Sequence, residues 1–152
     1  MEILIYASIL AILVIAVVRI VLTSSLSVSE LNSDKKIVTT GQVAMEAIIR
    51  EIRQASDVTG SSVFSSNPGV LSLRTVQSPG SQVVVTRDFS LASGRLYKQD
   101  DIGGAEYVTA PETPISGLTF WHSSATSSSL ITIQIIIGSK TFYGSAVLRS
   151  KY

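Results

Sequence analysis

The chain opens with a long apolar run, MEILIYASILAILVIAVVRIVL, in which Ile3 to Val18 carry no charge. About 20 residues of α-helix rise roughly 30 Å, which is the thickness of the hydrocarbon core of a bilayer. Arg19 lies near the far end, where a long basic side chain can reach the membrane interface. The run therefore predicts a transmembrane helix over residues 1–22 in preference to a buried core helix. A cleaved secretory signal is disfavoured, because no basic region precedes the run and no small-residue cleavage site follows it.

A second helical pattern follows in residues 23–59. Apolar residues recur there at spacings of seven, three and four, which is typical of one face of an amphipathic helix. The residues expected to form this buried stripe are Leu31, Val38, Met45, Ile48 and Ile52. Charged residues, Glu46, Arg50 and Glu51 among them, are expected on the opposite, solvated face. No proline occurs before Pro68, so one helix is predicted from about Glu2 to about Val58, ending near Gly60.

Residues 60–152 have the alternating pattern of β-strands. The clearest example is Ile131, Ile133, Ile135 and Ile137, followed by the hairpin signal Gly138-Ser139 and a returning strand over 141–149. One face of such a sheet must be covered, and the amphipathic helix is the only long apolar stripe left to cover it. The predicted fold class is therefore α+β, with one long N-terminal helix packed on an antiparallel β-sheet head.

The composition excludes several kinds of chemistry. The chain has 152 residues, a formal net charge of +1, no cysteine and one histidine, His122. Disulfides and thiolate sites are therefore impossible, a typical zinc site is hard to build, and nothing favours nucleic-acid binding. No catalytic arrangement is recognisable, so neither an enzyme activity nor a small-molecule substrate is expected.

One acidic loop is a candidate calcium site. Asp100, Asp101 and Glu106 surround the pair Gly103-Gly104, and carboxylates on a glycine-containing loop can bind Ca²⁺. The spacing is not that of a strong calcium motif, so a solvated turn is the preferred interpretation and no cofactor is expected. Trp121 alternates with Phe120 and is a candidate contact residue on the solvated face of a strand.

Several stretches resemble a known family. The stretch MEILIYASILAILVIAV resembles the N-terminal helix of type IV pilins and type II secretion pseudopilins, with Glu2 on the family's glutamate. The stretch QVAMEAIIREIRQASDV resembles the end of that helix in minor pilins and in J-type minor pseudopilins. The stretches SGRLYKQD, ISGLTFWHSS and FYGSAVLRS resemble their later strands. The basic leader and the Gly-Phe-Thr-Leu residues that precede the family's glutamate are absent here, which favours a start inside a longer gene over a leaderless protein.

The resemblance implies a structural subunit that is stored in the bacterial cytoplasmic membrane and assembled into a pilus or a secretion-type filament. Its partners would be other pilin or pseudopilin subunits, contacted through the N-terminal helix, and Glu2 would pair with the N-terminal amine of a neighbouring subunit. The head would be extracytoplasmic, although Arg19, Lys35 and Lys36 alone would place it in the cytoplasm. Two alternatives stay open. The chain could be a permanently anchored extracytoplasmic binding domain, and Glu2 could be an interfacial residue stabilised by the helix dipole.

Overall fold

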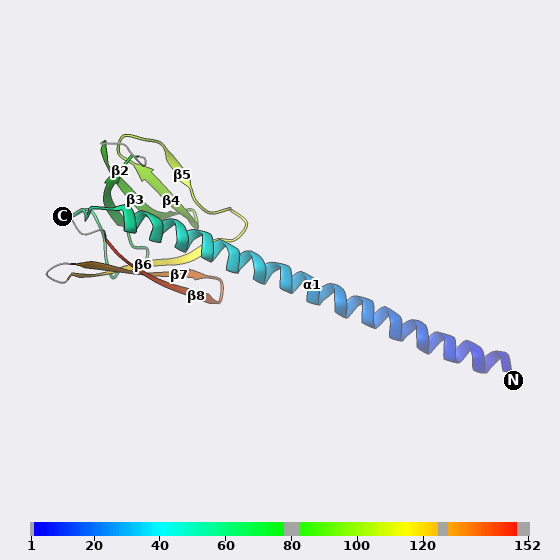
Figure 1. Cartoon of the computed structure of the whole chain (residues 1–152). Helices are drawn as coiled ribbons and strands as arrows, with labels where there is room; N and C mark the ends of the chain where they lie inside the picture. Colours follow the sequence, from blue (N-terminus) through cyan, green and yellow to red (C-terminus); the bar gives the residue numbers. More distant parts are fainter. Residues whose placement is uncertain (1, 78–82, 125–127, 149–152) are drawn as a thin grey trace. The chain divides into compact units, whose positions relative to one another are not determined.

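The structure is α+β, with one long helix followed by antiparallel strands. The computed structural model describes residues 2–77, 83–124 and 128–148, without the side chains of residue 4 and residues 25–30. The chain divides into two compact units, residues 1–36 and 37–152. The elements, shown in Figure 1, are α1 (Glu2–Gln54), β1 (Asp57–Val58), β2 (Leu71–Val76), β3 (Val84–Ala92), β4 (Arg95–Asp100), β5 (Ala105–Tyr107), β6 (Ile115–Ser124), β7 (Ser129–Ile137) and β8 (Lys140–Val147).

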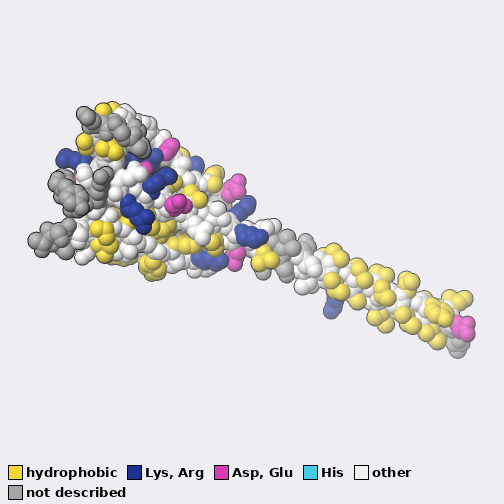
Figure 2. Space-filling model, viewed as in Figure 1, with side chains coloured by type: hydrophobic (Ala, Val, Ile, Leu, Met, Phe, Trp, Pro, Cys, Tyr) yellow, Lys and Arg dark blue, Asp and Glu magenta, His cyan; other side chains and the backbone are white. Residues whose placement is uncertain are grey.

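The first unit is helical and apolar. One segment of it, Ile5–Ser24, has a mean hydropathy of 2.8 and none of its residues is buried. Figure 2 shows mainly hydrophobic side chains along the N-terminal part of the helix. The segment is therefore long and apolar enough to cross a membrane, as its sequence predicts.

The second unit, called the head unit below, contains two antiparallel sheets instead of the one sheet expected. The strand orders are β1-β2-β3-β4-β5 and β6-β7-β8. The chain leaves the first sheet after β5 through residues 108–114, which include Pro111 and Pro114. Proline lacks the N–H that a sheet ladder requires, so this segment cannot continue the pairing. The amide of Ile115 then donates to the carbonyl of Gly94 at 2.7 Å, and β6 starts the second sheet from there.

The C-terminal part of α1 contributes side chains to one hydrophobic core, to which strands of both sheets also contribute. Met45, Ile48 and Ile52 are buried as predicted, and Val38 is half-buried. The prediction for Leu31 is wrong, because it lies in the first unit and its side chain is 61% exposed. The core cluster also contains the following side chains: Ala44, Leu71, Leu73, Phe89, Leu96, Leu118, Phe120, Ile131, Ile133, Ile135 and Ile137.

Two glycines let α1 and β8 approach closely. A Cβ atom on Gly41 would lie 2.7 Å from the ring of Phe142, and one on Gly144 would overlap the sulfur of Met45. Neither contact is compatible with a larger side chain unless the neighbour moves. The helix therefore lies directly on the inner face of β8.

The predicted hairpin is confirmed. β7 and β8 pair in continuous register from Leu130↔Val147 to Ile137↔Lys140, and Gly138 adopts a φ of 58° in the turn. The four alternating isoleucines of β7 face the core, since each is at most 1% exposed. Arg149, which was expected to extend β8, lies outside the described residues.

The helix ends at Gln54, earlier than the predicted end near Val58. Asp57 and Val58 instead pair with Arg74 and Leu73 as strand β1. The amide of Ser56 already donates to the carbonyl of Arg74 at 2.8 Å, so sheet pairing replaces helical hydrogen bonding at this point. The predicted helix end near Val58 is therefore wrong by about one helical turn.

Candidate functional sites

Glu2 lies in the first turn of α1 and is exposed. Three residues later the apolar segment begins. Helix N-termini stabilise carboxylates, because unpaired N–H groups and the helix dipole face them. The position next to a membrane-length apolar segment fits an interfacial residue and equally fits a residue that needs a partner charge in an apolar assembly.

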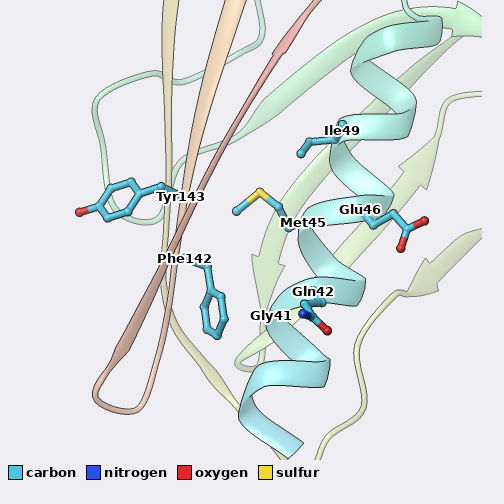
Figure 3. Close-up of a pocket in the computed structure, with 7 residues that line it drawn as sticks. All are labelled: Gly41, Gln42, Met45, Glu46, Ile49, Phe142 and Tyr143. Carbon is cyan, nitrogen blue, oxygen red and sulfur yellow. The ribbon is translucent and has the colours of Figure 1, made fainter. Parts of the chain in front are cut away.

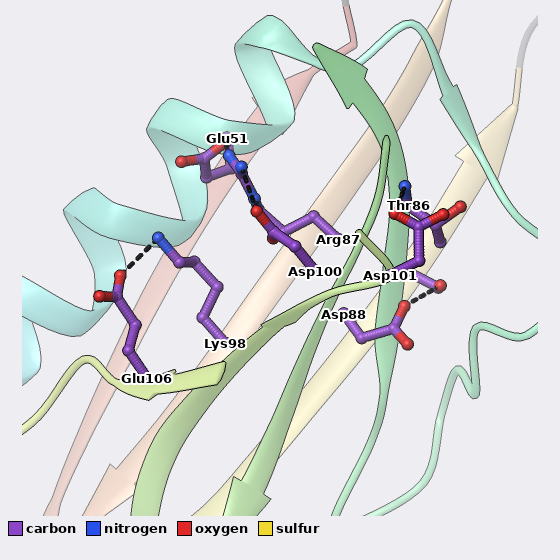
Figure 4. Close-up of polar contacts among 9 residues, drawn as sticks. Glu51, Thr86, Arg87, Asp88, Lys98, Asp100, Asp101 and Glu106 are labelled. Atoms are coloured by element: carbon purple, nitrogen blue, oxygen red, sulfur yellow. Dashed lines mark hydrogen bonds and ion pairs between the residues drawn. The ribbon is translucent and has the colours of Figure 1, made fainter. Parts of the chain in front are cut away.

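A buried ion network joins α1 to the first sheet (Figure 4). The guanidinium of Arg87 donates to Glu51 at 2.6 Å and to both carboxylate oxygens of Asp100 at 2.6 and 2.7 Å. Arg87 and Glu51 are each only 7% exposed. Charge-assisted, bidentate bonds of this kind are among the stronger polar contacts in proteins. The network thus links the helix, β3 and β4 through one side chain.

The electrostatics of the network follow from this geometry. The hydrogen bonds from Arg87 lower the pKa of Asp100 below its usual value, and this effect outweighs its partial burial. The pKa of Arg87 is raised, chiefly by its hydrogen bonds to Asp100, against the opposing effect of burial. Arg87 and Asp100 are therefore both held in their charged forms at neutral pH.

The helical periodicity predicted that Glu51 lies on the solvated face of the helix, and this prediction is wrong because Glu51 is buried. Ala44, Ile48, Glu51 and Ala55 are spaced by four, three and four, so Glu51 lies on the buried stripe itself. Two signals pointed to the network. One was an acid at a core position of the helix, and the other was Arg87 interrupting the apolar face of β3.

The structure gives the three residues of the candidate calcium loop separate roles. Asp100 binds Arg87, Glu106 pairs with Lys98 at 2.5 Å, and one carboxylate oxygen of Asp101 accepts from the amide of Thr86 at 3.0 Å. Among the described residues, no group of three or more His, Cys, Asp or Glu side chains could hold a metal ion. Asp100 and Glu106 lie on β4 and β5 and are held in ion pairs, so the solvated turn predicted for them is wrong for these two residues.

His122 and Trp121 lie near the end of β6. The ring of His122 stacks on Phe64, with 5.2 Å between the ring centroids, and its Nε2 contacts the hydroxyl of Ser129. No acidic partner of His122 is seen among the described residues, so this pair lacks the third group of a catalytic triad. Trp121 is 37% exposed beside the buried Phe120, in agreement with its predicted place on the solvated face.

A groove in the head unit was not predicted. It has a volume of about 470 Å³ and lies between α1 and β8 (Figure 3). The helix contributes Gly41, Gln42, Met45, Glu46 and Ile49, and the strand contributes Phe142 and Tyr143. Met45, Ile49 and Phe142 make it mainly apolar, and Glu46 is the only carboxylate among the lining residues. Sequence periodicity identifies residues that face a core, and it does not reveal where that core is left partly open.

Comparisons with protein-family models, with curated proteins and with solved structures found no match to this chain. The function is therefore argued from the residues and their geometry.

Proposed function

We propose that this chain is a structural subunit, a minor pilin or pseudopilin, that is stored in a bacterial cytoplasmic membrane and assembled into a type IV pilus or a type II secretion-like filament. The observation that carries the proposal is Glu2 in the first turn of a helix whose next segment, Ile5–Ser24, is long and apolar enough to cross a membrane. The same helix ends in the core of an α+β head, which is consistent with a pilin-like arrangement.

The proposed chemistry is packing. In the membrane the apolar segment contacts lipid, and in the filament it contacts the equivalent helices of neighbouring subunits. A carboxylate in such an apolar core costs several kcal/mol unless it is paired or neutralised. A neighbour's N-terminal amine would satisfy Glu2 in one register only, so the pair would fix how far one subunit rises above the next.

The test is Glu2→Ala, expressed from the native locus, with Ile3→Ala as the matched control. Ile3 is 84% exposed, so its truncation changes the same helix end without removing a charge. We expect both variants to appear normally in the membrane fraction and only Glu2→Ala to be lost from sheared filaments. Equal recovery of both variants in filaments would remove the assembly role of Glu2.

A permanently anchored extracytoplasmic binding domain is the second candidate, and the groove between α1 and β8 favours it. The same fractionation separates the two functions. A wild-type chain that never enters a filament fraction, although it is abundant in the membrane, would support the binding domain and contradict the filament subunit.

A further inference from the structure

The strands that the structure describes in the head unit form two sheets with four edges, and three of these edges are protected against pairing with another chain. An edge strand presents unpaired N–H and C=O groups, which natural proteins usually shorten, cover or flank with charge. β1 has two residues and β5 has three, with the Glu106–Lys98 ion pair on β5. The outer side of β6 is covered, because the amides of Ser65 and Gly69 donate to the carbonyls of Phe120 and Leu118 at 2.8 and 2.7 Å.

The fourth edge, β8, is neither short nor covered in the described part of the chain. β8 is eight residues long and pairs with β7 alone. Its pairing runs without a bulge, and residues 141–147 include neither a charge nor a proline. Only Lys140, at its start, is charged. This strand therefore offers a long, regular and neutral backbone edge, which is the geometry that another extended chain requires.

The groove lies beside the same edge. Phe142 belongs to both the strand and the groove, and Figure 3 shows Met45 and Ile49 on α1 directed toward β8. Alternate residues of a strand point to opposite faces of its sheet. A strand added to β8 would therefore direct every second side chain toward α1 and the apolar groove, and the others toward the opposite face of the sheet.

We propose that β8 and this groove form a docking site for an extended polypeptide strand of another protein. The backbone edge specifies the occupant as a polypeptide, and the groove specifies apolar side chains at alternate positions. Glu46 is the only carboxylate among the lining residues, so a lysine or arginine is favoured at the position of the docked strand beside it, and an acidic residue is disfavoured there. The site goes beyond the proposed filament role and does not depend on it.

The test uses the full chain in nanodiscs and a fluorescent, end-blocked peptide of the sequence Lys-Val-Thr-Val-Thr-Val-Thr-Val-Lys. We expect saturable binding, absent from empty nanodiscs, and slower amide exchange within Thr141–Val147. A peptide with the same side chains but N-methyl groups on all its valines and threonines lacks the amide donors along both of its edges. It should bind at least about tenfold more weakly.

Two protein variants test the location of the site. Tyr143→Lys and Ser145→Lys alter exposed residues of β8 and add the charge that protects natural edges. Each should weaken peptide binding by about tenfold, whereas Val84→Lys, at a residue 54% exposed on β3, should not. Unchanged circular dichroism of each variant verifies that it folds.

Three outcomes would overturn the proposal. They are no saturable binding by the wild-type chain, equal binding of the N-methylated peptide, and binding that is indifferent to both lysine variants. A fourth outcome would overturn the identity of the partner proposed here. If Ser145→Cys forms a disulfide between two copies and that contact is lost in Tyr143→Lys, the occupant is a second copy of this chain.

Discussion

Replacing Arg87 by methionine tests whether the ion network stabilises the head unit. Methionine keeps an apolar side chain of similar length and removes the guanidinium. The wild-type side chain makes three bonds, one to Glu51 at 2.6 Å and two to Asp100 at 2.6 and 2.7 Å. The variant leaves two carboxylates without their cation, and Glu51 is only 7% exposed to solvent that could replace it.

The size of the effect follows from these contacts. A hydrogen bond to a charged group contributes about 1.5–3 kcal/mol, but water entry and protonation limit the total loss when several are removed together. Removing one partner of a buried ion pair typically costs about 3–5 kcal/mol, and we expect Arg87→Met to fall in that range at pH 7. Arg87→Lys should lose less, because an ammonium keeps the charge but not the bidentate geometry.

The cost should depend on pH in a known direction. Arg87 lowers the pKa of Asp100 in the folded state, so Asp100 contributes stability above its unfolded pKa of about 3.9. That contribution is lost as the pH falls through the lower, folded pKa. The variant never had this contribution, so the difference in unfolding free energy between wild type and Arg87→Met should shrink below about pH 4.

The assay is denaturant unfolding of the full chain in detergent, followed by the fluorescence of Trp121, which is the only tryptophan. Arg74→Met is the matched control, since Arg74 is exposed on the neighbouring strand β2 and should change stability by at most about 0.5 kcal/mol. A loss below about 1 kcal/mol for Arg87→Met at pH 7, or an equal loss at pH 7 and pH 3, would refute the reasoning.

Two further substitutions test the helix-on-sheet core by the same assay. Ile48→Asp should cost several kcal/mol, because Ile48 is fully buried, while Val43→Asp, at a residue 46% exposed on the same helix, should cost far less; similar losses would contradict the packing. Gly41→Ala should destabilise by about 1–3 kcal/mol, because its Cβ meets the ring of Phe142, although helix propensity alone predicts about 1 kcal/mol of stabilisation. Phe142→Ala in the same chain should remove that penalty, and a stabilising Gly41→Ala would show that the ring moves aside freely.

Periodicity predicted the elements of this fold well, because it reports which side of an element is buried. The spacing of Met45, Ile48 and Ile52 located the buried helix face, and the alternation from Ile131 to Ile137 located β7 and its hairpin. Leu31 fits the same spacing and is exposed, because it precedes the head unit and periodicity does not report where a partner surface begins.

What the sequence did not predict depends on contacts between distant residues. Because glutamate is a charged residue type, Glu51 was predicted to lie on the solvated face. The energetic cost of burying its carboxylate is offset by the ion pair with Arg87, which is 36 positions away in the sequence. The number of sheets depended on how residues 108–114 leave β5, which alternation within strands cannot show. The groove and the open edge of β8 arise from how the helix and the sheets pack together, so no local sequence pattern predicted them.

The two proposals depend on different residues of the chain, so they can be tested separately. The filament role depends on Glu2 in the first unit, and the strand-docking site depends on β8 in the head unit. Glu2→Ala should therefore leave peptide binding unchanged, and Tyr143→Lys should leave membrane insertion unchanged. A Tyr143→Lys chain that inserts but is lost from filaments would identify the docked strand as part of the filament. A Tyr143→Lys chain that assembles normally would place the strand partner outside the filament.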